Sequence, residues 1–274
     1  MKFSVLTSVY KNDSPSAFKE AMDSLLCQTL MPDEIVLVRD GEVPAELQGA
    51  IDEYLVKYPE IFTYIPLEQN GGLGNALRIG CETARNSIAA RMDSDDICLP
   101  DRFEKQIKFL KENPDIDIVS GTISEFNNDP SVITDYRVLP KAHGEIVELL
   151  KSRSPLNHVT VMFKRDSVMR AGNYQDFYLF EDWYLWIRMY LAGCKFANID
   201  DVLVNVRVGT MSARRGGMKY YKSCKRLLKF MKQNKMIGFI KYTKLKTVRF
   251  IGYVLLPNKL RALMYKKLLR KKTT

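Results

Sequence analysis

Short apolar segments that alternate with helical segments constrain the fold of this chain more than any other feature. Four such segments are rich in apolar and β-branched residues, as is typical of buried strands: residues 3–10, 34–41, 62–66 and 87–92. Between the first two, Phe18, Met22 and Leu25 recur at the spacing of a helix. Because strands joined by helices pair in parallel through right-handed crossovers, the sequence predicts an α/β fold whose mostly parallel central sheet is flanked by helices.

The later chain extends this pattern. Residues 116–123 and 159–164 are predicted strands, and helices are expected at residues 100–110, 146–151 and 182–192. In sheets of this kind, ligands bind at the carboxyl ends of the strands. Polar residues that directly follow a predicted strand are therefore the candidate site residues.

Charge divides the chain into two parts. Residues 201–274 carry 21 basic residues and one acidic residue, whereas residues 1–200 carry 21 basic and 31 acidic residues. We therefore expect a domain over residues 1–217 and a basic tail over residues 218–274. With 274 residues, 46% of them hydrophobic, the chain can bury a core, which excludes a disordered protein and a miniprotein held by disulfides.

The amino terminus and the cysteines bear on the compartment. The first residues become polar at Thr7 and Ser8, too early for the apolar run of a signal peptide, so we expect no export. Five scattered cysteines without a Cys-x-x-Cys pair favour a reducing compartment over a disulfide framework or a zinc site. The most apolar late segment, residues 250–256, is far shorter than the roughly 20 residues that cross a bilayer.

Three carboxylates, Asp93, Asp95 and Asp96, directly follow the fourth apolar segment. Crowded carboxylates raise one another's pKa unless a cation lies among them, and Mg²⁺ and Mn²⁺ prefer such oxygen ligands. The cluster is therefore a candidate metal site. A solvated acidic loop, or the N-cap of the helix after Pro100, would explain the same residues.

A glycine turn, Asn70-Gly71-Gly72, precedes a predicted helix at residues 73–84. Its glycines allow a close approach of the backbone, and the amides at a helix N-terminus attract an anion. A plain turn with a helix cap explains the glycines more simply. Arg78, one turn into the helix, either reaches a diphosphate or faces solvent.

A second group of carboxylates, Glu181 and Asp182, lies between aromatic and aliphatic residues. Burial among apolar neighbours raises the pKa of a carboxyl group, which suits a general base near neutral pH. Asp182 would equally serve as the cap of the helix that begins beside it. His158, one of two histidines, is on its own better explained as a structural histidine.

The order and spacing of these motifs resemble the family 2 glycosyltransferases, and more narrowly their bacterial amylovoran and capsule branch. The motifs are Ser4-Val5-Leu6-Thr7-Ser8-Val9-Tyr10, Leu37-Val38-Arg39-Asp40-Gly41, Asn70-Gly71-Gly72-Leu73, Asp93-Ser94-Asp95-Asp96, Asn157-His158-Val159-Thr160, Glu181-Asp182-Trp183, Val206-Arg207-Val208 and Arg214-Arg215-Gly216-Gly217. The resemblance covers roughly residues 1–220. It implies the Rossmann-like GT-A fold, with a nucleotide-sugar-binding half at residues 1–100 and an acceptor half at residues 101–217.

On the donor side, the resemblance implies a UDP-sugar, with UDP-galactose or UDP-glucose favoured, and Mn²⁺ or Mg²⁺ as cofactor. The implied nucleotide-binding residues are Ser8, Tyr10, Asp40, Arg78 and Asp93. Among them, Asp40 would bind the nucleobase and Asp93 the ribose. Asp95 would coordinate the metal.

On the acceptor side, the resemblance implies that Asp182 is the catalytic base. It would take a proton from the acceptor hydroxyl as that group attacks the anomeric carbon with inversion. Glu181, His158 and Trp183 would shape the acceptor site. The acceptor expected in this branch is an oligosaccharide linked to a lipid through a polyprenyl diphosphate. A nucleotide-sugar-binding or scaffold protein without turnover is the alternative.

The basic tail alternates apolar residues with lysine and arginine at helical spacing over residues 219–232 and again over residues 260–272. Basic amphipathic helices bind anionic membrane surfaces, so we expect a peripheral protein on the cytoplasmic face of the cell membrane. Helices packed back on the domain would explain the same spacing, and the two uses can coexist. Nucleic-acid binding is disfavoured, because no recognition motif is present and the acidic domain repels a polyanion.

Overall fold

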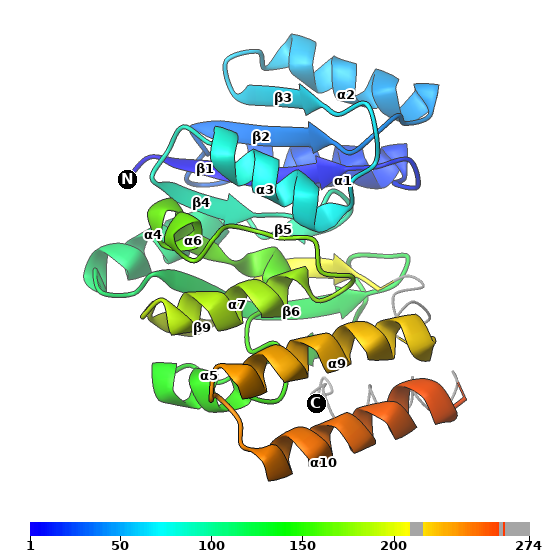
Figure 1. The fold of residues 1–274 in the computed structure, drawn as a ribbon. Helices are drawn as coiled ribbons and strands as arrows, with labels where there is room; N and C mark the ends of the chain where they lie inside the picture. The colour runs from blue at the N-terminus through cyan, green and yellow to red at the C-terminus, as the bar shows by residue number, and fades with distance from the viewer. Residues whose placement is uncertain (209–215, 258–259, 261–274) are drawn as a thin grey trace.

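The computed structural model describes residues 1–208, 216–257 and 260 (Figure 1). Arg214 and Arg215 of the last motif lie outside the described residues, as does the amphipathic stretch predicted beyond Leu260.

Among the described residues, nine strands form one curled sheet in the order β3-β2-β1-β4-β8-β6-β9-β5, with β7 beside β6. Their bounds are β1 (Phe3–Val9), β2 (Glu34–Arg39), β3 (Phe62–Pro66), β4 (Ile88–Arg91), β5 (Ile97–Cys98), β6 (Ile118–Phe126), β7 (Ile133–Arg137), β8 (Met162–Lys164) and β9 (Phe196–Arg207). Strands β1 to β4 pair in parallel, as predicted. Beyond β4 the directions are mixed, because β8 is antiparallel to both β4 and β6 whereas β6 and β9 are parallel.

Helices cover both faces of the sheet (Figure 1). Their bounds are α1 (Pro15–Leu26), α2 (Ala45–Lys57), α3 (Leu73–Thr83), α4 (Arg102–Glu112), α5 (His143–Leu150), α6 (Arg165–Arg170), α7 (Glu181–Leu191), α9 (Gly217–Gln233) and α10 (Phe239–Phe250). Alternate residues of β2 enter different cores: Val36 and Val38 join residues of α3, α5, α7 and α9, and Ile35 and Leu37 join residues of α1, α2 and α4. The period-2 alternation of a strand thus builds a sheet with a core on each side.

Several elements differ from the sequence-based expectation. The strand predicted at residues 159–164 is shortened, because a 3₁₀ turn (His158–Thr160) precedes β8. The helix predicted from Pro100 begins at Arg102, after the unpredicted β5. The long strand β9 was also missed. Its apolar run is interrupted near its middle, where the β6–β9 register shifts twice.

The first tail helix packs on the domain. The apolar stripe of α9 is buried in the same core as α3 and α7, and it comprises Tyr220, Cys224, Leu227, Leu228 and Met231. This stripe is therefore unavailable to a membrane, and the packing alternative is the correct explanation of its spacing. In the part of the chain that the structure describes, no helix combines the length and apolar character needed to span a bilayer.

Candidate active site

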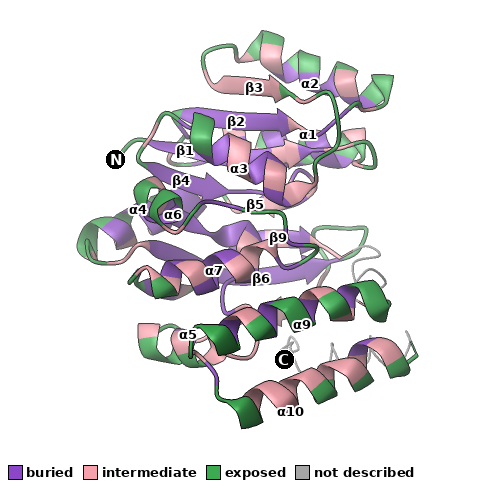
Figure 2. Ribbon diagram, viewed as in Figure 1, coloured by how far each residue is buried: buried purple, intermediate pink, exposed green. Residues whose placement is uncertain are grey.

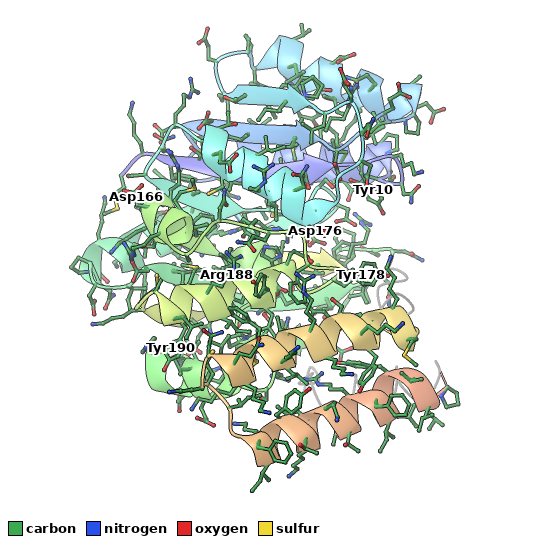
Figure 3. All side chains as sticks on the ribbon, in the orientation of Figure 1. Tyr10, Asp166, Asp176, Tyr178, Arg188 and Tyr190 are labelled. Carbon is green, nitrogen blue, oxygen red and sulfur yellow. The ribbon has the colours of Figure 1, made fainter. Side chains whose placement is uncertain are left out.

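The candidate residues gather where the parallel strands end. Tyr10 follows β1, Asp40 follows β2 and Asp93 follows β4, so the three lie at one edge of the sheet. In Figure 3, Tyr10 and the Tyr178 side chain from the segment before α7 both lie on this side, whereas Tyr190 lies at the far end of α7. The fold thus brings the donor-side and acceptor-side candidates to the same end of the molecule.

Asp40 ties the end of β2 to the glycine turn. Its two carboxylate oxygens accept hydrogen bonds from the amides of Gly71 (2.7 Å) and Gly72 (2.9 Å), and its carbonyl accepts one from the Asn70 side chain (3.0 Å). Gly41 has a φ of +85°, and a Cβ there would lie 2.7 Å from the Asn70 nitrogen. The turn therefore holds Asp40 against the start of α3.

The loop after β1 reaches the acidic cluster through Asp13. Its Oδ2 accepts hydrogen bonds from the Tyr10 amide (3.1 Å) and from the Ser94 hydroxyl (2.7 Å). Ser8, the residue before the last one of β1, is half-buried. Asp13, which the sequence analysis did not single out, thus connects Tyr10 to the acidic cluster.

The three acidic residues form a compact cluster. Asp93, Asp95 and Asp96 each offer a carboxylate oxygen within 4.8 Å of the others. Asp96 is 2% exposed, and its Oδ1 accepts a hydrogen bond from the Arg207 amide (2.8 Å). The N-cap position of α4 is Asp101. A helix cap therefore does not explain the cluster, and the burial of Asp96 shows that the cluster is not wholly solvated.

The electrostatics of the cluster fit a divalent cation. Burial, followed by the negative charges of Asp93 and Asp13, raises the pKa of Asp95 to about 6. Burial also raises the pKa of Asp96, followed by the charges of Asp93 and Asp95. Carboxylate oxygens so close together are the donor set that Mn²⁺ and Mg²⁺ prefer. Asp95 and Asp96 would hold the ion, since both oxygens of Asp93 are already engaged.

Arg91 engages Asp93. Its guanidinium, 3% exposed, binds both carboxylate oxygens, with an Nη1–Oδ2 distance of 2.6 Å. Behind it, Arg102 is also buried and donates to the Arg91 carbonyl (2.7 Å). The sequence analysis missed Arg91, although a cation inside a buried strand directly before an acidic cluster is a recognisable signal of a buried ion pair.

Arg207, at the end of β9, holds the acidic loop from the other side. Besides its amide bond to Asp96, its Nε donates to the Asp95 carbonyl (3.2 Å) and its Nη2 to Glu20 (2.5 Å). Its guanidinium also lies over the Phe126 ring, 4.7 Å from the centroid. The Val206-Arg207-Val208 motif, to which the sequence analysis gave no role, thus fixes the backbone of the cluster.

Asp182 lies in the first turn of α7. Its Oδ2 accepts a hydrogen bond from the Ser154 hydroxyl (2.9 Å). The N-cap position of α7 is Phe180 and has no side-chain capping bond, so Asp182 does not cap the helix. Trp183 is buried and donates its indole N–H to the Leu150 carbonyl (2.9 Å). Trp183 therefore anchors the helix turn that carries Asp182.

His158 and Tyr174 lie between the two groups of carboxylates. His158 Nε2 and the Tyr174 hydroxyl are 3.1 Å apart. Burial, and then the charge of Arg91, lowers the pKa of His158 well below its ordinary value, so this imidazole is neutral at pH 7. Burial raises the pKa of Tyr174, on which Arg91 and Asp182 both act electrostatically. Tyr174 therefore lies within electrostatic reach of both Arg91, the partner of Asp93, and Asp182.

Two other predicted residues lie on or against α3. Arg78 forms an ion pair with Glu82 (3.0 Å) and donates to Asn75 (2.9 Å), both on α3. Glu181 lies against α3, where a Cβ at Gly74 would be 3.4 Å from the Glu181 Cβ. The diphosphate contact of Arg78 stays a prediction.

The chain matches the family model described as glycosyl transferase family 2 over residues 4–170. It is 37% identical to the amylovoran biosynthesis glycosyltransferase AmsE of Erwinia amylovora, covering 97% of this chain and 98% of the relative. It is 38% identical to the UDP-Gal:alpha-D-GlcNAc-diphosphoundecaprenol beta-1,3-galactosyltransferase of Escherichia coli, covering 98% and 97%. An uncharacterized glycosyltransferase of Haemophilus influenzae is 40% identical over 99% of this chain and all of the relative.

Solved structures share the fold. S. aureus TarS 1–349 in complex with UDP-GlcNAc aligns with a TM-score of 0.67 at 16% identity, covering 98% of this chain and 76% of the other. The mannosyltransferase PcManGT from Pyrobaculum calidifontis, in complex with GDP-Man and Mn²⁺, aligns with a TM-score of 0.63 at 16% identity, covering 95% and 71%. The family model, the full-length relatives and the shared fold lead to one conclusion: this chain is a glycosyltransferase of family 2.

Proposed function

We propose that the protein transfers a hexose from a UDP-sugar, UDP-galactose or UDP-glucose, to a hydroxyl group of a lipid-linked oligosaccharide during polysaccharide assembly. The observation that supports this proposal most strongly is the compact cluster of Asp93, Asp95 and Asp96, whose carboxylate oxygens lie within 4.8 Å of one another. In the proposal, Asp182 supplies a separate carboxylate for the acceptor. Transfer from a nucleotide sugar needs both chemistries, because the leaving diphosphate gains charge while the acceptor hydroxyl loses a proton.

The relatives support the substrates. The E. coli relative is named for UDP-Gal as donor and for a GlcNAc-diphosphoundecaprenol acceptor, and the E. amylovora relative for amylovoran biosynthesis. Among the structural neighbours, one binds UDP-GlcNAc and another GDP-Man with Mn²⁺. A UDP-hexose, a lipid-linked acceptor and Mn²⁺ or Mg²⁺ are the corresponding assignments for this chain.

In the proposed reaction, Asp182 accepts the proton of the acceptor hydroxyl while the oxygen attacks the anomeric carbon. The bond from that carbon to the diphosphate oxygen breaks, UDP leaves from the opposite face and the configuration inverts. A divalent ion held by Asp95 and Asp96 would neutralise charge on the departing diphosphate. Ser154 donates to Asp182 and orients its carboxylate, leaving the second oxygen for the proton.

The donor-side residues take supporting roles in the same proposal. Asp93 would accept a hydrogen bond from a ribose hydroxyl, with its carboxylate oriented by Arg91. Asp40 and the glycine turn that it holds would contact the nucleobase beside Ser8 and Tyr10. Glu181, His158 and Trp183 would shape the acceptor site, with neutral His158 acting by its hydrogen bond rather than by charge.

The proposed place of work is the inner face of the cell membrane. A polyprenyl-linked acceptor is embedded in the bilayer, so the enzyme has to work at its surface. The excess of lysine and arginine after residue 200 supports attachment to anionic lipid.

A donor screen tests this function. The purified full chain is incubated with Mn²⁺, one nucleotide sugar at a time and a GlcNAc-diphosphate-lipid acceptor, and free nucleoside diphosphate is measured. We expect UDP release that depends on the acceptor with UDP-galactose or UDP-glucose. Release without any dependence on acceptor, or turnover with GDP-sugars instead, would contradict the proposal.

A further inference from the structure

We propose that the outward face of α10 and of the turn that follows it is a docking surface for an anionic bilayer. This surface, called here the α10 face, consists of Ile240, Lys244, Thr247, Val248, Ile251 and Leu255. The inference rests on the proposed function in one respect, because it names the membrane partner of an enzyme with a lipid-linked acceptor.

The spacing of these residues places them on one side of a helix. From Ile240 through the π-helical turn (Ile251–Leu255) that extends α10, they recur every three or four positions, with Thr247 and Val248 adjacent. Their exposure is large for apolar side chains: 84% for Ile240, 56% for Val248, 46% for Ile251 and 61% for Leu255. Figure 2 shows α10 as exposed or intermediate along its length, in contrast to the buried stripe of α9.

The inner side of α10 is already used. Tyr253 is buried and meets Tyr220 of α9 with ring centroids 4.7 Å apart, and Phe250 meets Tyr221 at 5.2 Å. These contacts fix which side of α10 faces outward. The α10 face is therefore a second apolar stripe, distinct from the one that packs the tail on the domain.

Charge identifies an anionic lipid surface as the partner. No acidic residue follows Asp201 in the sequence, and α10 carries four cations, of which Lys244 is exposed on the α10 face. Two others are used elsewhere, because Lys241 pairs with Glu148 of α5 and Arg249 contacts the Ser152 carbonyl on the inner side. An apolar stripe that carries a cation and no acid of its own matches a helix that lies in the interface of an anionic bilayer with its apolar side chains among the acyl chains. Cations beside an apolar stripe gain from lipid phosphates, and their contributions add.

The α10 face also ends beside the acceptor side of the active site. From the inner side of α10, Arg249 donates to the Ser152 carbonyl, and its guanidinium lies 5.7 Å from the centroid of the Trp183 ring. Ser154, two residues further along, donates to Asp182. Docking through the α10 face would therefore hold the catalytic side close to the bilayer surface, where the sugar of a lipid-linked acceptor emerges.

Vesicle binding of the full chain tests the proposal. A triple variant, Val248→Ser/Ile251→Ser/Leu255→Ser, is compared with wild type in flotation on phosphatidylglycerol–phosphatidylethanolamine vesicles and on phosphatidylcholine vesicles. We expect the triple variant to bind the anionic vesicles at least about tenfold more weakly, because three apolar side chains lose their place in the bilayer. The matched control is Val56→Ser/Val132→Ser, which removes two exposed apolar side chains elsewhere and should bind as wild type does. Binding of the triple variant within twofold of wild type overturns the proposal.

A second variant keeps the test independent of folding in the triple variant. Both native tryptophans, Trp183 and Trp186, are buried, so a new exposed tryptophan dominates any change in emission on lipid binding. Val248→Trp should shift its emission to shorter wavelength on anionic vesicles and be quenched by brominated acyl chains. Emission that stays unchanged in the presence of bound vesicles overturns the proposal.

Two acceptors separate this proposal from the proposed function. The triple variant should transfer sugar to a water-soluble acceptor analogue within twofold of wild type and lose transfer to the same sugar on a lipid in vesicles. Equal transfer to both acceptors overturns the docking surface and leaves the enzymatic function intact. Failure of wild type to use either acceptor, with vesicle binding still dependent on the α10 face, overturns the function and supports the docking surface.

Discussion

Removing Arg91 tests how the acidic cluster is held together. The Arg91 guanidinium is 3% exposed and grips both oxygens of Asp93, whose side chain is 35% exposed. Breaking a fully buried pair by deleting one partner costs about 3–5 kcal/mol. Because the Asp93 carboxylate regains water on its exposed side, we expect Arg91→Met to lower the free energy of unfolding by about 2–3 kcal/mol.

Urea unfolding measures this loss, with Trp183 and Trp186 as buried fluorescent reporters. The matched control is Arg170→Met, which removes an exposed arginine 3.9 Å from Asp117 and should cost less than about 1 kcal/mol. The pair is confirmed if Arg91→Met/Asp93→Asn recovers most of the loss, since the uncompensated charge is then gone. A cost for Arg91→Met equal to that of the control would refute the reasoning.

The loss of Arg91 should also weaken ligand binding. Without Arg91, the Asp93 carboxylate is free to turn toward Asp95 and Asp96, and its uncompensated charge adds to the crowding there. We expect Arg91→Lys, which keeps the charge but loses the two-pronged geometry, to bind UDP with Mn²⁺ more weakly than wild type by calorimetry. Unchanged UDP affinity in this variant would show that the orientation of Asp93 does not matter for the nucleotide.

Three further substitutions probe the base, the fit of α3 and a buried carboxylate. Asp182→Asn should lower kcat about 10²–10⁴-fold and leave UDP binding within twofold, because the amide cannot take a proton; near-normal kcat rules Asp182 out as the base. Gly74→Ala puts a Cβ 2.8 Å from the Gln175 carbonyl oxygen, so the segment before α7 must shift. We expect the free energy of unfolding to fall by about 1–3 kcal/mol, measured by thermal melting, and kcat to fall as well. An unchanged melting temperature contradicts this tight contact. Burial raises the pKa of Glu34, but hydrogen bonds from Ser4, the Arg85 amide and Thr63 outweigh it and set the pKa below its ordinary value of 4.5. Its stabilisation is therefore present above that value and lost as pH falls through the lowered pKa, so Glu34→Gln should destabilise by about 1–3 kcal/mol at pH 7 and by progressively less in acid. A difference independent of pH would refute the assignment.

The first half of the sheet was predictable because its signals are local. Apolar runs such as residues 34–41 end in a polar residue and a turn glycine, and the helices between them show clear periodicity. Strand β9 escaped because two exposed acids, Asp200 and Asp201, break its pattern where its pairing with β6 shifts register. Its strand conformation depends on pairing with β6, which lies about 80 residues earlier in the chain. The residues of β9 themselves carry no signal of this pairing.

The candidate site was predictable in its acids and not in its cations. Asp93, Asp95, Asp96 and Asp182 stand out because charges next to apolar runs are conspicuous in a sequence. Arg91 and Arg207 act through partners set by the fold, the former on Asp93 and the latter on Asp96 from the far end of β9. In the tail, helical spacing predicted α9 correctly, but spacing alone does not distinguish a stripe buried against a domain from one that faces a membrane.

The central claim is that the acidic cluster grips the diphosphate of a nucleotide sugar through a divalent ion. Calorimetric titration of UDP into wild type and Asp95→Ala, each with Mn²⁺ and with a chelator, tests it most directly. The account predicts that wild type binds UDP tightly with Mn²⁺ and loses this binding with the chelator. It also predicts that Asp95→Ala loses most of the metal-dependent affinity. Equal UDP affinity for the two proteins, or affinity indifferent to the metal, would contradict it.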